Sequence, residues 1–289
     1  MNKQNTHYYS QEWVERIVLA ILFAGIGSLI MIVFSPWHPL LDRISDYLGR
    51  IVLIAFLLIV YRFTLKIPSL NKYHLIFLGL LIMAIAVSLD WLMGVYLIDS
   101  LGVDGNTPSG FALLKLNECF VVLMVIILFT KLSGNSLQSI YIQKGNLKLG
   151  LIIGLSTFTL AAAGSIFMAS SLFKGQNLEF SRILPWVPWI LIFVLANATL
   201  EETLFRGLFL KKLQPFFGKF ISNILIAVVF TVLHLSASYT SDQYLFIIVL
   251  FPLALLWGYI IQKTDSLLAS ILFHAGMDIP IILGTFSNL

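Results

Sequence analysis

Long apolar segments separated by short polar connections dominate this 289-residue chain. A helix needs about 20 mostly apolar residues to cross the hydrocarbon core of a bilayer, and the sequence offers about nine such segments. Hydrophobic residues make up 59% and charged residues 11% of the chain, whereas roughly a quarter of a water-soluble domain is charged. The sequence therefore predicts an all-α polytopic integral membrane protein with about 8–9 transmembrane helices. The predicted spans are 17–34, 47–63, 75–97, 111–129, 149–168, 186–210, 221–235, 244–261 and 267–283.

The second predicted span has the weakest signal. Only residues 51–61 are free of interruption, and the segment crosses the bilayer only if Arg50 and Arg62 extend to opposite interfaces. The alternative is a re-entrant or interfacial segment.

The basic residues indicate an orientation. The net charge is +4, and Lys and Arg are spread through the predicted loops instead of gathering on one face, so we expect membrane lipid and no nucleic acid as a partner. Most of them lie on one side if the N-terminus is cytoplasmic, which predicts that topology in the plasma membrane. The single cysteine, Cys119, excludes an internal disulfide and a Cys-based zinc site.

Three charges interrupt the sixth predicted span, in the stretch ALANATLEETLFRGLFLKK. Glu202 and Arg206 have the i,i+4 spacing of a helical ion pair, and neither charge would be tolerated alone in the membrane. Glu201 is rotated by about 100° from Glu202 and has no cation one turn away, so its carboxylate must face a cavity or water. A carboxylate removed from bulk water is a better proton acceptor, which suits a general base. Alternatively, Lys211 and Lys212 mark the interface and the three charges merely lie near it.

Two histidines in the late spans complete a candidate site. His234 ends the stretch FTVLH, and His274 opens HAGMD, in which Asp278 lies one helical turn later and can orient the imidazole. A lone membrane histidine is more often a packing residue, but two of them beside paired glutamates favour a function.

The stretches EETLFR, FTVLH and HAGMD resemble, in order, the EExxxR, FxxxH and HxxxN/D motifs of the CAAX protease and bacteriocin-processing (CPBP, or Abi) family of intramembrane endopeptidases. The resemblance implies an all-helical fold with the motifs around a cavity, peptide-bond hydrolysis, and a membrane-associated peptide or protein as substrate. The prenyl-protein branch of that family usually has asparagine at the position of Asp278. By position, the family's catalytic residues correspond to Glu201, Glu202, Arg206, His234, His274 and Asp278.

The resemblance also divides the chain. Residues 1–16 form a cytoplasmic N-terminal segment, residues 17–183 the variable N-terminal transmembrane helices, and residues 184–289 the CPBP-like catalytic core.

Two catalytic schemes stay open. In a metal-independent scheme Glu201, assisted by His234, deprotonates a water molecule, and His274 with Asp278 stabilises the oxyanion. In a metal scheme zinc is bound by His234, His274 and Glu201, with one position left for water. The sequence has no HExxH pattern, so the first scheme is preferred and no cofactor is favoured, with zinc as the alternative.

Two other functions compete with hydrolysis. A non-catalytic scaffold or a bacteriocin-immunity protein usually shows eroded motifs, whereas all three are intact here. A proton-coupled transporter also places acids in spans, and Asp90 is an intramembrane acid that the motifs do not explain. Its alternative is a buried acid bonded to a neighbouring helix. Lys115 and Glu118, spaced i,i+3, predict a structural pair, and Cys119 beside them predicts packing.

Overall fold

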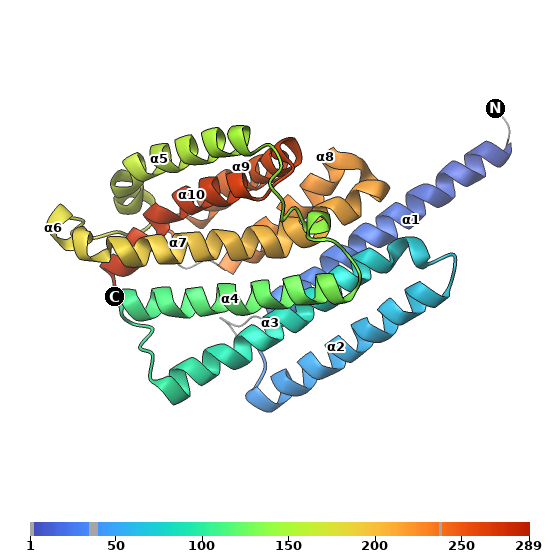
Figure 1. Cartoon of the computed structure of the whole chain (residues 1–289), viewed down its shortest axis with the longest axis horizontal. Coiled ribbons are helices and arrows are strands. Elements are labelled where there is room, and N and C mark those ends of the chain that lie inside the picture. Colours follow the sequence, from blue (N-terminus) through green and yellow to red (C-terminus); the bar gives the residue numbers. More distant parts are fainter. Residues whose placement is uncertain (1–2, 35–39, 237–238) are drawn as a thin grey trace.

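The computed structural model describes residues 3–34, 40–236 and 239–289, and within these ranges all regular secondary structure is helical. The first turns of α1 and the end of α10 lie at opposite ends of an elongated bundle (Figure 1). A single π-helical turn, Leu29–Val33, continues α1, and a second one, Glu202–Gly207, joins α7 to α8. The helices are α1 (Lys3–Ser28), α2 (Arg43–Lys66), α3 (His74–Leu101), α4 (Pro108–Leu132), α5 (Leu147–Leu172), α6 (Phe180–Ile183), α7 (Val187–Glu201), α8 (Leu208–Leu233), α9 (Gln243–Thr264) and α10 (Leu268–Ser287).

Among the described residues, 8 helical segments are long and apolar enough to cross a membrane. The protein is an all-α polytopic membrane protein, as predicted. The predicted spans 186–210 and 221–235 both fall within one of these segments, Phe180–Leu233. Gly218 interrupts that segment with φ 70° and ψ 173°, a backbone conformation that glycine adopts without steric cost. The chain therefore changes direction between the two predicted spans.

The helix α2 covers the second predicted span and is long enough to cross the bilayer. The side chain of Asp42 caps its first turn by accepting hydrogen bonds from two backbone N–H groups. The sequence prediction required Arg50 to extend to an interface, but the structure buries it, with only 3% of the residue exposed. Its Nε donates to Asp46 Oδ2 at 2.8 Å, and its guanidinium lies 5.0 Å from the centre of the Trp91 ring. The charge is thus neutralised inside the bundle.

Large apolar side chains cover the outer surface of the bundle. Ile21 on α1 and Val52 on α2 are each 66% exposed, and Phe167 on α5 is 76% exposed. Such an apolar surface is unfavourable in water and suits contact with lipid chains.

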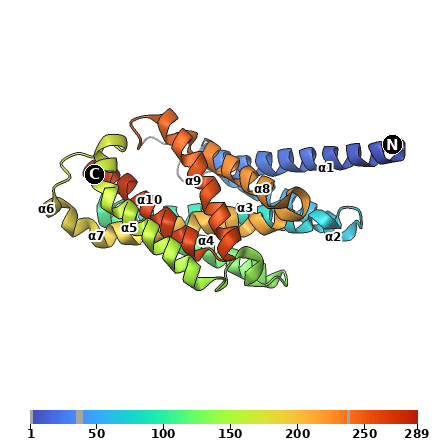
Figure 2. The ribbon, with the colours of Figure 1, turned by 90° about the horizontal axis from the view of Figure 1, so that it is seen from above.

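The late helices pack closely around one region. α10 packs along α5 and also contacts α7 and α9, and α8 contacts α9 (Figures 1 and 2). At the contact with α5, a Cβ on Gly276 would lie 2.8 Å from the Cα of Phe158, so only glycine allows this approach. This packing fixes α10, which carries the third motif, against α7, which carries the first.

Candidate active site

The first motif begins at Glu201, the last residue of α7, and continues on the π-helical turn Glu202–Gly207. Arg206 Nη1 donates to Glu202 Oε1 at 2.9 Å, and both side chains are 0% exposed, so the predicted ion pair is present and fully buried. Arg206 Nη2 also donates to the carbonyl of Ala254 on α9, and the guanidinium lies 4.4 Å from the Phe230 ring centre. π-Helical turns inside helices occur frequently at functional sites. Here the turn ties the first motif to α8 and α9.

Glu202 has further partners that the sequence did not indicate. Its Oε1 also accepts a hydrogen bond from His274 Nδ1 at 2.8 Å, and its Oε2 accepts one from Ser270 Oγ at 2.7 Å. Since an ionised carboxylate only accepts, the Nδ1 atom of His274 carries a proton. The imidazole stacks on the Trp257 ring, with ring centres 3.9 Å apart and an angle of 9° between the planes. The ring of His274 is thus fixed in position and orientation.

The other ring nitrogen of His274 lies between two carboxylates. Nε2 is 3.5 Å from Glu201 Oε2 and 3.6 Å from Asp278 Oδ1. Glu201 is 8% exposed, and its buried Oε2 has no hydrogen-bond partner. Asp278 is held by Asn197, whose Nδ2 donates to Asp278 Oδ2 at 3.0 Å. The two adjacent glutamates therefore differ as expected. Both oxygens of Glu202 accept hydrogen bonds, whereas Oε2 of Glu201 accepts none.

The second motif lies at the edge of this cluster. His234 begins a short 3₁₀ turn directly after α8, and its Nδ1 is 2.8 Å from the carbonyl oxygen of Phe230, to which it donates. The Phe230 ring lies 4.6 Å from the His234 ring and 6.0 Å from the His274 ring, centre to centre. Among the described residues, no hydrogen bond or ion pair joins His234 to Glu201. Its assistance to Glu201 stays a prediction.

Ser270 and Asn197 were not singled out as site residues from the sequence, although each lies four residues from a motif residue on the same helix. Ser270, His274 and Asp278 follow one another at four-residue intervals on α10, and Asn197 precedes Glu201 by one turn on α7. Residues four apart share a helix face, so the polar faces of α7 and α10 are visible in the sequence once both helices are aligned on their motifs. The stacking of Trp257 has no comparable sequence signal.

A metal site was the alternative for these residues. In the part of the chain that the structure describes, no three His, Cys, Asp or Glu side chains gather closely enough to hold a metal ion. The Nδ1 atoms of His234 and His274 both contact protein oxygens, which leaves Nε2 of each ring as the nitrogen that could face a ligand. The described residues thus show no gathered ligand set of His234, His274 and Glu201, and the choice between the two catalytic schemes stays a prediction.

Asp90, Lys115 and Glu118 form a second buried group of charges. Lys115 also lies within electrostatic range of Glu201. Lys115 Nζ lies 2.5 Å from Glu118 Oε2, which confirms the predicted pair, and both side chains are largely buried. Asp90 on α3 is 5% exposed and lies within electrostatic range of this pair and of Arg50. Opposite charges that share a buried region reduce one another's desolvation cost. This pattern is typical of structural packing between α2, α3 and α4.

The late part of the chain is similar to one known family. Residues 183–280 match the family described as Type II CAAX prenyl endopeptidase Rce1-like. The matched segment contains all three motifs, and the match confirms the resemblance to the CAAX protease and bacteriocin-processing family. No curated protein and no solved structure matches the chain.

Proposed function

We propose that the protein is an intramembrane endopeptidase that hydrolyses a peptide bond of a membrane-associated protein or peptide, with Glu201 as the general base. The observation that carries the proposal is the free Oε2 atom of Glu201, buried beside the Nε2 atom of His274. A base must have an oxygen available to take a proton, and both oxygens of Glu202 already accept hydrogen bonds.

The reaction begins with a water molecule held at Glu201. Glu201 Oε2 takes one proton from the water, and the resulting hydroxide attacks the carbonyl carbon of the scissile peptide bond. The C–O bond forms while the electrons of the C=O double bond move to the oxygen, which gives a tetrahedral oxyanion. His274, protonated at both ring nitrogens, donates from Nε2 to that oxygen.

The collapse of the tetrahedral intermediate completes the hydrolysis. The C=O bond re-forms, the C–N bond breaks, and the leaving nitrogen takes the proton that Glu201 holds. The products are a carboxylic acid and an amine, and the enzyme returns to its starting protonation state.

The other motif residues position this pair of reacting groups. Glu202 holds His274 through Nδ1, and Arg206 balances the charge of Glu202. Asp278, oriented by Asn197, stabilises a positive His274 at Nε2. The three carboxylates outnumber the one guanidinium, so the cluster is negative without His274. A protonated imidazole at His274 balances that charge better than a neutral one.

The experiment identifies the substrate and the chemistry together. Membrane peptides are quantified by mass spectrometry in cells that lack the protein and in cells that regain the wild-type chain or Glu201→Gln at equal levels. We expect the same peptides to accumulate in the deletion and in Glu201→Gln, and to disappear with the wild type. If Glu201→Gln clears them as the wild type does, the motifs serve binding and the scaffold hypothesis takes over.

A further inference from the structure

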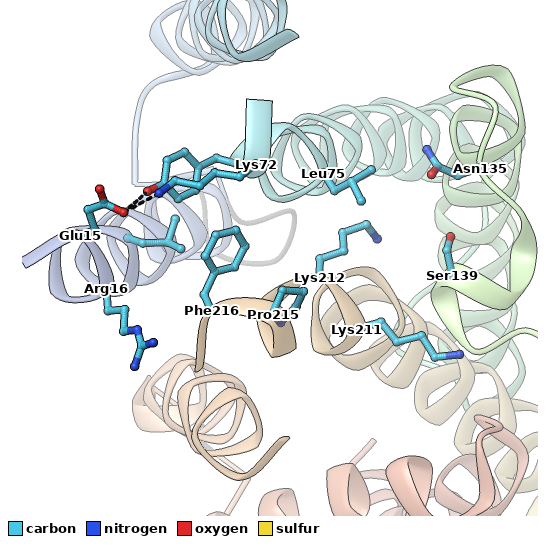
Figure 3. Close-up of a pocket in the computed structure, with 12 residues that line it drawn as sticks. Glu15, Arg16, Lys72, Leu75, Asn135, Ser139, Lys211, Lys212, Pro215 and Phe216 are labelled. Atoms are coloured by element: carbon cyan, nitrogen blue, oxygen red, sulfur yellow. Dashed lines mark hydrogen bonds and ion pairs between the residues drawn. The ribbon is translucent and has the colours of Figure 1, made fainter. Parts of the chain in front are cut away.

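A cavity lies apart from the catalytic cluster. It has a volume of about 680 Å³, and α1, the start of α3, the turn Leu137–Ile140 after α4 and the first part of α8 form its walls (Figure 3). Its size falls within the roughly 300–1,000 Å³ of small-ligand sites. None of the six motif residues lines it.

Basic side chains dominate the polar part of this cavity. Arg16, Lys72, Lys211 and Lys212 line it together with one acid, Glu15. Lys72 Nζ lies 2.6 Å from Glu15 Oε2, and Lys211 Nζ lies 3.0 Å from an oxygen of Asp265. Basic side chains therefore outnumber acidic ones in the lining of the cavity.

Lys212 carries the uncompensated part of the positive charge. It is only 8% exposed. Its ammonium group donates to the carbonyl of Leu208 in the preceding turn, and within the described residues it forms no ion pair. Figure 3 shows its side chain extending from α8 toward the Leu75 side of the cavity. A buried ammonium with a single neutral acceptor is costly unless an anion completes its surroundings.

The cavity also adjoins a lipid-facing surface. Trp13 is 61% exposed one turn before Arg16, and Val14 and Ile17 on the same helix are 60% and 54% exposed. Aromatic and basic side chains near the start of a span are typical of the headgroup level of a bilayer. Apolar side chains of Leu19, Leu75 and Phe216 line the cavity beside its charges. A ligand that joins an anionic head to apolar chains matches both features.

We propose that this cavity binds the phosphate-bearing headgroup of an anionic membrane phospholipid. Lys212 contacts the phosphate directly, Arg16, Lys72 and Lys211 add positive potential around it, and the apolar wall contacts the glycerol and the first carbons of the acyl chains. The site is independent of the proposed hydrolysis, since it shares no residue with the motifs.

The wild-type chain provides the first test. The full-length protein, purified in a neutral detergent, is titrated with phosphatidylglycerol, with phosphatidylcholine and with inorganic phosphate, and thermal unfolding and native mass spectrometry record binding. We expect phosphatidylglycerol to raise the unfolding temperature more than phosphatidylcholine and to bind more tightly than inorganic phosphate. Equal effects of the two lipids would overturn the proposal. Inorganic phosphate that binds as tightly as phosphatidylglycerol would overturn it in favour of a site for a free anion.

Three substitutions of lysine test whether Lys212 forms the site. Lys212→Met should weaken phosphatidylglycerol binding about tenfold or more, the loss expected when one charge-assisted hydrogen bond is removed. Lys212→Arg should retain binding. Lys148→Met removes an exposed lysine that does not line the cavity and should bind phosphatidylglycerol like the wild type.

A stability measurement separates a ligand site from a structural role. Without lipid, Lys212→Met should be at least as stable as the wild type, because it removes an uncompensated buried charge, yet it should lose the extra stabilisation by phosphatidylglycerol. Phosphatidylglycerol binding that is equal in Lys212→Met and Lys148→Met would contradict the assignment.

Discussion

Replacing Glu202 by glutamine should destabilise the protein far more than the same change at its neighbour Glu201. Glutamine keeps the shape of the side chain, and its carbonyl oxygen can still accept from Arg206 and His274. The charge is lost, however, and the guanidinium of Arg206 remains 0% exposed with no carboxylate to balance it. Breaking a buried ion pair by removing one partner costs about 3–5 kcal/mol. We expect a loss of that size for Glu202→Gln.

Two control variants make the comparison specific. Glu201→Gln removes no hydrogen bond of the Oε2 atom and only the longer 3.5 Å contact with His274 Nε2, so its effect on unfolding should be smaller, about 1 kcal/mol. Ser270→Ala removes one neutral donor to Glu202 Oε2 and should cost about 1 kcal/mol.

The assay is reversible unfolding of the purified proteins in mixed micelles, followed by circular dichroism, with all variants at the same protein and detergent concentration. Equal losses for Glu201→Gln and Glu202→Gln would refute the division of the two carboxylates into a free one and a structural one.

Three further predictions test the metal, the second charge group and the helix packing. If Glu201 activates water without a metal, thorough chelation should leave hydrolysis of the identified peptide largely intact; activity lost to chelator and restored by zinc would establish the metal scheme. Asp90→Asn should leave turnover unchanged, since among the described residues Asp90 interacts with Lys115, Glu118 and Arg50 and with none of the motif residues, and a loss of turnover at normal stability would favour a coupled proton path. Gly276→Leu should sharply reduce the yield of detergent-stable protein, because even a Cβ would meet the backbone of Phe158 at 2.8 Å; a yield equal to the wild type would mean that α5 and α10 do not pack as described.

The sequence predicted the fold class and the partners within the first motif because both depend on local spacing. Apolar segment length indicates membrane helices, and an i,i+4 spacing indicates the Glu202–Arg206 pair. The spacing suggests that exchanging these two charges would preserve the pair. The structure predicts that it would not, since Glu202 also faces the donors of His274 and Ser270.

The sequence could not predict features that depend on packing between distant helices. Arg50 was expected to extend to an interface because it borders the uninterrupted apolar run 51–61, whereas the structure pairs it with Asp46 inside the bundle. Its guanidinium also donates to the carbonyl of Val87 on α3, a contact that depends on how α2 and α3 pack. The stacking of Trp257 on His274 likewise joins α9 to α10, and no sequence period specifies it.

The central claim is that Glu201 activates the water molecule that cleaves the peptide bond. The most direct measurement is the turnover rate of purified Glu201→Gln, reconstituted in liposomes with the peptide that accumulates in deletion cells, beside the wild type at matched folded concentration. We expect the turnover rate of Glu201→Gln to be lower by about 10²- to 10⁴-fold, the usual contribution of a general base. Its free energy of unfolding should be close to that of the wild type. A Glu201→Gln protein that cleaves the peptide at the wild-type rate would contradict the central claim.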